Sequence, residues 1–246
     1  MAPIIRTEKL RKVYAVGKER VVALNNVDLS IEKGEFCCIV GQSGSGKSTL
    51  LNQLAGLEKP TSGKVYIGKH EISKMTENAL AEFRQQHLGF IFQSYNLIPH
   101  QTVLSNVELA LTLSGVSKTE RRKRAVEALE MVGLGDQINK KPNQMSGGQM
   151  QRVAIARALV NNPAVILADE ATGNLDTRTS FEILVLFQKL HAEGRTIIFV
   201  THNPDIANYS SRNIMLRDGR VISDEYNDNI MSAAEGLAAL PQNTDE

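Results

Sequence analysis

The chain has 246 residues, of which 42% are hydrophobic and 22% are charged, and its formal net charge is +1. This composition is typical of a globular protein with a sizeable core, and α/β folds of this length are often a single domain. No run of about 18 apolar residues occurs, which argues against a membrane-spanning helix, and residues 1–12 contain no apolar signal core. The only cysteines, Cys37 and Cys38, are adjacent and cannot form a disulfide framework, which suits a reducing compartment.

The predicted strands are short segments rich in β-branched and apolar residues. In chain order they are residues 4–10, 21–31, 36–40, 64–67, 88–92, 164–168 and 196–201, followed by a hairpin of residues 213–217 and 220–223. Residues 36–40 form an uninterrupted apolar run that ends at Gly41, which indicates a strand buried on both faces. The Asp218-Gly219 pair is typical of a tight hairpin turn.

Helices are predicted in the intervals between several of these strands. Residues 46–56 have the pattern of a helix that directly follows a glycine-rich turn, and another helix is expected around residues 181–190. Residues 94–160 have a largely helical pattern, with a charged amphipathic helix at residues 117–131. The succession of buried strands and helices indicates a doubly wound α/β fold.

The C-terminal segment differs in charge from the rest of the chain. After Arg220 there are six acidic residues and no Lys or Arg. Residues 227–246 are therefore predicted to be a frayed acidic tail with at most one short helix, on Ile230, Ala234 and Leu237.

A glycine-rich segment joins the strand at residues 36–40 to the helix that follows. Its residues fit the pattern G-x-x-x-x-G-K-[ST]: Gly41, Gln42, Ser43, Gly44, Ser45, Gly46, Lys47 and Ser48, with Thr49 next. Glycines let backbone N–H groups curve around a phosphate chain, and the helix N-terminus adds about half a positive charge. We expect Lys47 to reach the β- and γ-phosphates and Ser48 to bind Mg²⁺. A chance Gly/Ser-rich loop is the alternative, and the flanking strand and helix argue against it.

Two acidic residues, Asp169 and Glu170, follow the apolar segment at residues 164–168. A buried parallel strand presents its C-terminal residues at the ligand-binding edge of a sheet. We expect Asp169 to hold Mg²⁺ directly or through water, and Glu170 to orient and deprotonate the attacking water. An acidic turn after a core strand is the alternative, which the phosphate loop in the same chain argues against.

A short glycine-containing motif resembles the signature of ABC ATPases: Met145, Ser146, Gly147, Gly148 and Gln149, followed by Gln151 and Arg152. It departs from the common L-S-G-G-Q form at Met145. Ser146 is a predicted N-cap, and the two glycines permit close approach to an anion. In the ABC family this motif faces the γ-phosphate bound to the other subunit. The resemblance therefore implies that two copies of the chain enclose ATP in a sandwich dimer.

Further positions match ABC landmarks in the family's order. They are Tyr14, which would stack on adenine; Gln93, which would sense Mg²⁺ and the attacking water; Asp176, in the loop that crosses the dimer interface; and His202, which would contact the γ-phosphate. The resemblance runs from about residue 4 to residue 226. It implies an ABC ATP-binding domain at residues 1–226 with a P-loop NTPase (RecA-like) core, an antiparallel β subdomain and a helical subdomain at about residues 94–160.

Residues 92–99, 102–107 and 168–176 look like the macrolide-export and lipoprotein-release type of ABC ATPase. Ala171 replaces the proline that this type usually has, which loosens the turn but removes no chemical group. The resemblance implies ATP hydrolysis coupled to a separate integral membrane permease, on the cytoplasmic face of the cell membrane and without a nucleic-acid partner. An apolar stretch is expected to form a socket for the permease: Tyr95, Leu97, Ile98 and Pro99. Internal packing is the alternative for this stretch.

Other members of the ABC class make different demands on the sequence. ATPases of DNA repair or chromosome structure place a long coiled coil between phosphate loop and signature, and no sustained heptads occur here. Translation factors of this class need two cassettes, and only one is present. An ATPase that signals through a membrane protein in cell division or peptide sensing would look much the same, so this alternative stays open.

Overall fold

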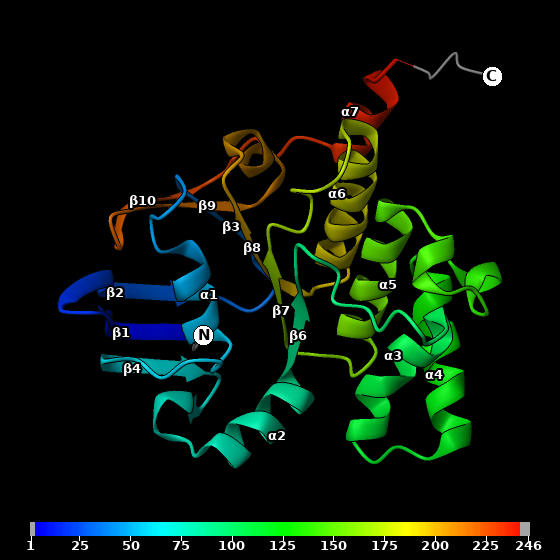
Figure 1. Ribbon diagram of the computed structural model, residues 1–246. Helices are drawn as coiled ribbons and strands as arrows, with labels where there is room; N and C mark the ends of the chain where they lie inside the picture. The colour runs from blue at the N-terminus through cyan, green and yellow to red at the C-terminus, as the bar shows by residue number, and fades with distance from the viewer. Residues whose placement is uncertain (1–2, 242–246) are drawn as a thin grey trace.

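The computed structural model describes residues 3–241 as two β-sheets with helices packed between and beside them (Figure 1). The strands are β1 (Ile5–Val16), β2 (Glu19–Ile31), β3 (Phe36–Val40), β4 (Ser62–Ile67), β5 (His70–Glu71), β6 (Leu88–Ile91), β7 (Val165–Asp169), β8 (Thr196–Thr201), β9 (Arg212–Arg217) and β10 (Arg220–Tyr226). The α-helices are α1 (Lys47–Leu54), α2 (Glu77–His87), α3 (Val103–Leu113), α4 (Lys118–Met131), α5 (Gly147–Leu159), α6 (Thr177–Ala192) and α7 (Ala233–Ala239). Short 3₁₀ helices are η1 (Ile72–Lys74), η2 (Gly135–Gln137), η3 (Pro142–Gln144) and η4 (Pro204–Tyr209). Within the described range, no helix is both long and apolar enough to cross a membrane.

The larger sheet brings the predicted site strands together. Its order is β10-β9-β3-β8-β7-β6, and all neighbouring strands are parallel except the terminal β9–β10 pair. The carboxyl ends of β3, β8, β7 and β6 therefore lie along one edge of the sheet, where parallel α/β proteins bind ligands. The smaller sheet has the order β2-β1-β4-β5 and is antiparallel.

Successive side chains of β3 enter two different hydrophobic clusters. Phe36 and Cys38 pack with residues of α3 to α6, whereas Cys37 and Ile39 pack with α1 and the antiparallel sheet. This is the two-residue alternation of a strand, and it confirms that the adjacent cysteines point to opposite faces. Burial raises the pKa of the Cys38 thiol to about 12, so the thiolate needed for reaction is scarce at neutral pH.

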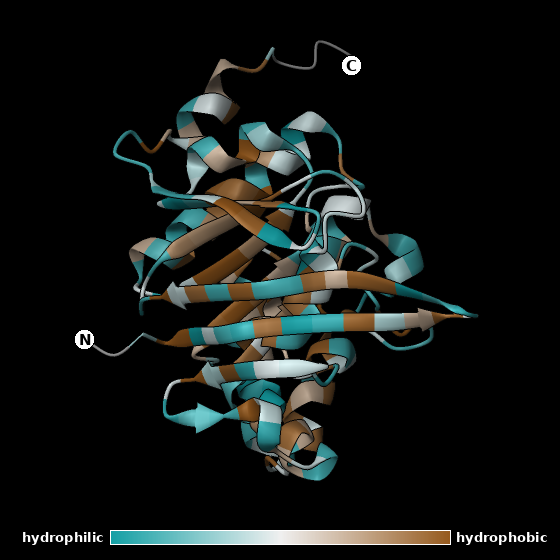
Figure 2. Ribbon diagram, turned by 90° about the vertical axis from the view of Figure 1, so that its left-hand side faces the viewer, coloured by the Kyte–Doolittle hydropathy of each residue, from teal (hydrophilic) through white to brown (hydrophobic). Residues whose placement is uncertain are grey.

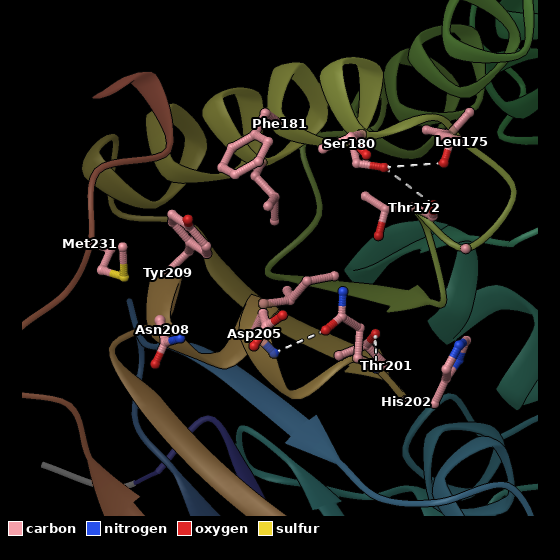
Figure 3. Close-up of a pocket in the computed structure, with 15 residues that line it drawn as sticks. Thr172, Leu175, Ser180, Phe181, Thr201, His202, Asp205, Asn208, Tyr209 and Met231 are labelled. Atoms are coloured by element: carbon pink, nitrogen blue, oxygen red, sulfur yellow. Dashed lines mark hydrogen bonds between the residues drawn. The ribbon is translucent and has the colours of Figure 1, made fainter. Parts of the chain in front are cut away.

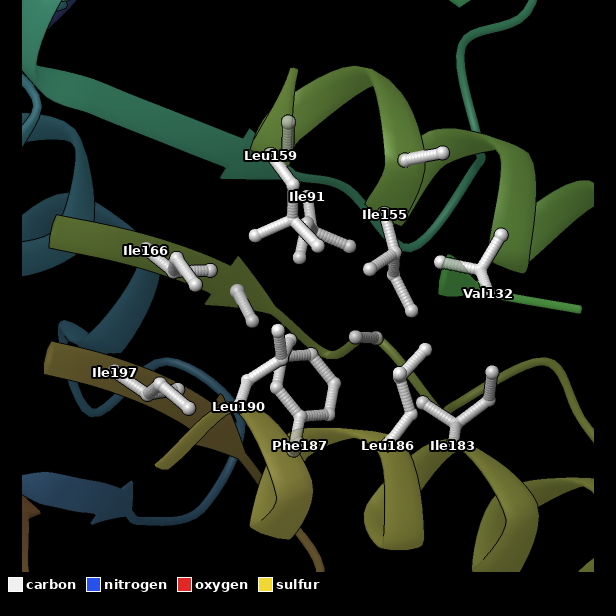
Figure 4. Close-up of a cluster of buried hydrophobic side chains, with 14 of the residues drawn as sticks. Ile91, Val132, Ile155, Leu159, Ile166, Ile183, Leu186, Phe187, Leu190 and Ile197 are labelled. Carbon is white, nitrogen blue, oxygen red and sulfur yellow. The ribbon is translucent and has the colours of Figure 1, made fainter. Parts of the chain in front are cut away.

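The first cluster holds α5 and α6 against the sheet. Figure 4 shows Phe187 and Leu190 of α6 facing Leu159 of α5, with Ile166 of β7 beside them. The ring of Phe187 meets Phe199 edge-on, with centroids 5.2 Å apart. Apolar residues at a helical spacing make this stripe of α6: Ile183, Leu184, Leu186, Phe187 and Leu190.

The antiparallel sheet extends further than its sequence predicts. Figure 2 shows hydrophilic and hydrophobic residues alternating along its two longest strands. The strand expected at residues 4–10 continues to Val16, because residues 11–16 pair with β2 in a hairpin in which Tyr14 lies opposite Val21. The extension places Tyr14 on a strand close to α1.

Two parts of the predicted helical region are different in the structure. Helix α2 comes before β6 and is absent from the sequence-based prediction, since only Leu80 and Phe83 are buried and the stripe is too narrow to give a clear period. Residues 94–102 form an irregular connection rather than a helix, and α3 begins only after the Thr102 N-cap.

The short helix expected in the acidic tail is present as α7, which contains Ala234 and Leu237 but not Ile230, whereas the expected fraying is wrong for this helix. Helix α7 packs against α6, and its Ala233 is fully buried. The Gln188 amide accepts from Ala233 N at 2.9 Å and donates to Met231 O at 2.7 Å. Glycine is required at position 236, because a Cβ there would lie 2.4 Å from Cε1 of Phe181. The expectation for residues 242–246 lies outside the described residues.

Candidate active site

The glycine-rich loop lies at the carboxyl end of β3 and leads directly into α1. Gly46 has φ 101°, and a Cβ there would lie 2.4 Å from the Ala23 carbonyl oxygen, so another residue would clash with backbone. A 2.9 Å hydrogen bond from Gly219 N to Ser45 O fixes the loop against the β9–β10 turn. The mouth of the loop, at residues 42–44, is exposed. The loop therefore has the shape and access that a phosphate cradle needs.

The Lys47 side chain turns back into its own loop. Its Nζ donates to Gly41 O at 2.8 Å and to Gln42 O at 2.9 Å, and the residue is only 6% exposed. Burial lowers the pKa of Lys47, while the nearby Glu170 and Asp169 carboxylates oppose that shift. The loop thus contains an ammonium group directed at the position that the sequence predicts for phosphate.

Ser48 and Asp169 meet beside this ammonium. Ser48 Oγ donates to Asp169 Oδ1 at 3.3 Å, and this contact joins the start of α1 to the end of β7. Burial raises the pKa of Asp169, and the bond from Ser48 partly offsets this effect. A hydroxyl and a carboxylate are hard oxygen donors, which is the ligand type that Mg²⁺ prefers.

Glu170 and His202 form a second polar pair at the same sheet edge. Glu170 Oε1 lies 3.0 Å from Nδ1 of His202, the residue that follows β8. Glu170 has φ 47°, an uncommon left-handed conformation for a non-glycine residue, and its N–H donates to Val200 O at 2.9 Å. Backbone strain of this kind occurs at functional sites when the surrounding structure enforces it. Here it directs the carboxylate toward His202.

Gln93 follows β6 and faces the loop after β7. Its Nε2 donates to Asn174 Oδ1 at 3.2 Å, and Asn174 Nδ2 donates back to Gln93 O at 3.3 Å. A Cβ on Gly173 would lie 2.9 Å from Gln93 Nε2 and 3.4 Å from Glu170 Oε2, so both side chains flank this glycine. The sequence placed Asn174 in the same loop as Asp176 but did not predict its contact with Gln93. The asparagine within the 168–176 segment was the available signal.

Tyr14 is held near α1 by a polar cluster that the sequence did not indicate. Its hydroxyl donates to Glu58 Oε2 at 2.6 Å, and Asn52 of α1 donates to Glu58 Oε1 at 3.2 Å. Lys12 Nζ lies 3.2 Å from Glu58 Oε2 and 5.1 Å from the centre of the Tyr14 ring. Burial is the main cause of the raised pKa of Tyr14. The tyrosine therefore has a fixed orientation beside the first turn of the helix that contains Thr49.

The signature motif is well ordered, but it is separated from the phosphate loop. Ser146 caps α5 through a capping box, in which Gln149 N donates to Ser146 Oγ at 3.3 Å and Ser146 N donates to Gln149 Oε1 at 3.0 Å. Helix α5 packs in the cluster on one face of the larger sheet, and α1 packs in the cluster on the other face. No hydrogen bond within residues 3–241 joins residues 146–149 to the loop at residues 41–48.

Asp176 lies next to the signature motif, not next to the phosphate loop. It caps α6, with Oδ1 accepting from Thr179 N at 2.9 Å and Oδ2 accepting from Thr179 Oγ1 at 2.6 Å. These bonds lower its pKa, with the Thr179 hydroxyl as the main cause. Gly148 packs against the same threonine, since a Cβ there would lie 2.3 Å from Thr179 Cγ2. The two helix N-termini thus form one unit.

An open hollow of about 640 Å³ adjoins this unit and His202 (Figure 3). The start of α6 forms one wall, the segment from His202 through η4 forms another, and Met231 lies at the far end. The segment after β8 is braced locally, because Thr201 Oγ1 accepts from Asn203 N at 3.0 Å and Asn203 Oδ1 accepts from Asp205 N at 3.0 Å. His202 and the loop that contains Leu175 therefore share one accessible face of the molecule.

The stretch expected to form a permease socket, residues 95–99, is half-buried to exposed in the structure. A Cβ on Gly147 would lie 2.9 Å from Tyr95 Oη, so the tyrosine points at the start of α5, and Leu97 packs against the hydrophobic cluster of that helix. Internal packing, the alternative left open by the sequence, describes these two residues. A groove of about 480 Å³ lies nearby, lined by parts of α2, β6, α3 and α5.

Comparison with known proteins identifies the family that this arrangement belongs to. Residues 24–173 match the family model described as ABC transporter. This chain is a member of the ABC transporter family. Its ABC cassette is 50% identical over 225 residues to the ABC transporter ATP-binding protein YvrO of Bacillus subtilis (strain 168), covering 92% of this chain and 98% of that protein.

Another relative and a solved structure of an ABC cassette support the same family assignment. The macrolide export ATP-binding/permease protein MacB 1 of Yersinia pestis bv. Antiqua (strain Antiqua) is 44% identical over 98% of this chain, which spans 37% of that protein. The dimeric, post-hydrolysis structure of the ATP-binding cassette MJ0796 bound to ADP and Pi is 47% identical, with a TM-score of 0.84 over 90% of this chain and 98% of that one. The fold is therefore that of a P-loop NTPase of the ABC type, and the protein is an ATP-binding ABC ATPase.

Proposed function

We propose that this ABC ATPase drives a separate membrane permease that exports or extracts a lipophilic compound, a peptide or a lipoprotein. The similarity to a macrolide exporter supports the substrate class. That relative combines ATP-binding and permease parts in one chain, and the present chain spans 37% of it. The ATPase would then work on the cytoplasmic face of the membrane, next to the permease.

ATP is bound, in this proposal, by the loop at residues 41–48. Backbone N–H groups at the start of α1 face the phosphates, and the Lys47 ammonium exchanges the carbonyls of Gly41 and Gln42 for the β- and γ-phosphate oxygens. Tyr14, oriented by Glu58, would stack on the adenine ring. These contacts hold the γ-phosphate at the edge where β7 and β8 end.

Mg²⁺ fits the same edge. Ser48 and Asp169 already lie within hydrogen-bond distance, and Gln93 would provide a further oxygen from the end of β6. The ion would neutralise charge on the β- and γ-phosphates as that charge develops. Few protein ligands are needed, because Mg²⁺ usually keeps several waters and binds through one or two carboxylates together with phosphates.

The Glu170–His202 pair is the observation that carries the hydrolytic part of the proposal. Glu170 projects from a strained backbone at the end of β7, directly after Asp169, and would orient a water for in-line attack on the γ-phosphate and accept its proton. His202 contacts the carboxylate on one side and would contact the γ-phosphate through its other ring nitrogen. The residues act by positioning and electrostatics, which dominate phosphoryl transfer.

Substitution of the carboxylate tests this assignment. Glu170→Gln keeps the size and hydrogen-bonding capacity of the side chain but removes the base, so kcat should fall by about 10²–10⁴-fold while ATP binding is retained. Glu225, an exposed residue of β10, provides the matched control Glu225→Gln, which should leave kcat unchanged. Phosphate release at saturating ATP is the measurement, and wild-type turnover in Glu170→Gln would contradict the role of the base.

The permease contact is proposed for the groove formed by α2, β6, α3 and α5. Its lining includes the apolar residues Phe90 of β6, Leu109 of α3 and Leu113, and Leu113 is 67% exposed. A short amphipathic helix of the permease would bury this surface. We expect Leu109→Glu with Leu113→Glu to leave basal hydrolysis intact and to abolish co-purification with the permease encoded by the adjacent gene.

The control for the groove is Leu57→Glu, which changes another exposed leucine, 44% exposed, elsewhere on the surface. Full recovery of permease with the double variant would contradict the groove assignment. Retained binding together with ATP-dependent signalling but no transport would favour the alternative function as a signalling ATPase.

A further inference from the structure

The connection after Gln93 has an unusual backbone. Tyr95 has φ 57° and Asn96 has φ 50°, so two consecutive non-glycine residues adopt the left-handed conformation. L-amino acids avoid this region because Cβ comes too close to the following carbonyl oxygen, and only asparagine of these two tolerates it well. Something outside the loop must therefore hold it in this shape.

Arg157 of α5 makes the contacts that do so. Its Nη1 donates to Asn96 O at 2.6 Å and its Nη2 donates to Tyr95 O at 2.8 Å, so one planar guanidinium binds both strained peptides. The start of the same helix also contacts the loop. A Cβ on Gly147 would lie only 2.9 Å from Tyr95 Oη, so the tyrosine hydroxyl lies directly against this glycine. The loop that begins at Gln93 is attached to α5 at two points.

The guanidinium has no competing role in an ion pair. Arg157 forms no salt bridge with any carboxylate of the described residues. Burial, with no opposing carboxylate, lowers its pKa. A half-buried cation whose polar partners are these two carbonyls contributes chiefly to the shape of the loop that carries them.

We propose that Arg157 is a positioning residue for ATP hydrolysis. It holds residues 93–99, here called the glutamine loop, in the left-handed form that directs Gln93 toward Asn174 and toward the proposed Mg²⁺ position. The proposal rests on the proposed role of Gln93 at Mg²⁺ and the attacking water. Because Arg157 and Ser146 belong to one helix, the glutamine loop and the signature motif move as one body. A shift of the signature motif is then also a shift of Gln93.

Arg124 provides a matched control in the same part of the molecule. It is also an arginine that donates to a backbone carbonyl, from Nη2 to Val160 O at 2.7 Å, but it joins α4 to the end of α5 and does not touch the glutamine loop. Arg157→Met and Arg124→Met therefore remove the same chemical group from neighbouring sites, with and without the loop contact.

The test compares steady-state hydrolysis by these variants of the full chain. A displaced Gln93 should cost Arg157→Met at least about tenfold in kcat and raise the Mg²⁺ concentration for half-maximal rate, while the KM for ATP changes by less than about threefold. Arg124→Met should change each quantity by less than about twofold. Hydrogen exchange of the peptide at residues 93–99 should accelerate only in Arg157→Met.

A double variant separates positioning from a general loss of structure. If Arg157 acts through Gln93, then Gln93→Ala with Arg157→Met should be no slower than Gln93→Ala alone. The proposal would be overturned if the kcat losses of the two single variants multiplied in the double variant. It would also be overturned if Arg157→Met kept wild-type kcat and wild-type hydrogen exchange. If Arg157→Met does not fold, Arg157→Lys takes its place, since one ammonium cannot repeat the fork on two carbonyls. Wild-type turnover of Gln93→Ala would contradict the proposed function of Gln93 itself, and the exchange data would still show whether Arg157 holds the loop.

Discussion

Two regions of the molecule differ in how their polar side chains are arranged. One is the phosphate-loop edge, where α1 begins and β7 and β8 end, and the other is the signature unit, formed by the N-termini of α5 and α6. At the edge, three elements contribute side chains that lie near one another: Lys47 and Ser48 begin α1, Asp169 and Glu170 lie at the end of β7, and His202 follows β8. In the signature unit, the polar groups of Ser146, Gln149, Asp176 and Thr179 bond to one another within two helix N-termini. The first region is organised around a position for a ligand. In the second region the polar side chains are hydrogen-bonded to one another, so its surface is already ordered before another molecule binds.

The largest expected effects come from one substitution in each region. Lys47→Ala removes the ammonium from the loop and should weaken ATP binding by about 10²-fold or more, so hydrolysis is lost with it. Ser146→Arg should also reduce hydrolysis by about 10²-fold, but it should leave nucleotide binding by the isolated chain almost unchanged, because the signature is remote from its own phosphate loop. Titration with a fluorescent ATP analogue measures nucleotide binding, and phosphate release measures hydrolysis. An equal loss of nucleotide binding in both variants would contradict the proposed difference between the two regions.

The sheet beneath the phosphate loop depends on a buried arginine. Arg212 of β9 pairs with Glu35 at 2.9 Å and with Asp224 of β10 at 2.7 Å, and its side chain is 8% exposed. Arg212→Ala leaves these carboxylates without their partner and should cost about 3 kcal/mol of unfolding free energy. Arg6→Ala breaks an exposed pair with Glu8 and should cost less than about 0.5 kcal/mol. Urea denaturation measures both, and similar midpoints would show that the buried network contributes little.

A smaller effect is expected at the N-cap of α6. Asp176→Ala should lower the unfolding free energy by about 1 kcal/mol at pH 7, whereas Asp176→Asn should be nearly neutral, because asparagine also caps helices. The pKa of Asp176 is lowered in the folded protein, so its contribution is present above the unfolded pKa and is lost as pH falls through the folded value. The aspartate protein should therefore lose its advantage over the alanine variant in acid. An unchanged difference there would contradict the charge-based part of the cap.

The smallest effect on catalysis is expected from the C-terminal segment. Truncation after Asn227 removes α7 and two of the backbone partners of Gln188, at Met231 and Ala233, so the thermal midpoint should fall. Basal ATP hydrolysis at moderate temperature should change by less than about twofold, since the removed groups do not contact the catalytic side chains. A loss above about tenfold, measured well below the midpoint, would mean that α7 controls the position of α6 or of the segment after His202.

The sequence predicted the strands and the helix that flank the phosphate loop, because these elements depend on local backbone chemistry. Gly46, Lys47 and the acidic pair after β7 sit in strand–loop–helix contexts that a single sequence shows clearly. The roles of Tyr14, Gln93 and Ser146 toward nucleotide stay predictions, since they concern a bound ligand.

What the sequence did not predict depends on contacts between distant segments. The inward position of Tyr95 follows from its packing on Gly147 and from Arg157, 62 residues away. The packing of α7 depends on Gln188, 45 residues before Ala233. Helix α2 was not predicted because few of its side chains are buried, so its apolar residues show only a weak helical period. Pattern-based reasoning detects local periods and motifs, and such long-range contacts leave no period in the sequence.

The central claim is that the signature unit of one copy completes the phosphate-loop edge of another. A two-fold arrangement would repeat this contact, with two ATP molecules in one isologous interface, and the γ-phosphate would be the group that both copies bind. The wild-type protein should hydrolyse ATP and the pair should then separate, whereas Glu170→Gln should accumulate the pair. Size-exclusion chromatography with light scattering on Glu170→Gln tests the claim most directly. The account predicts a dimer with ATP, a monomer with ADP, and loss of the dimer when Ser146→Arg is added; a monomer with both nucleotides at high protein and nucleotide concentration would contradict it.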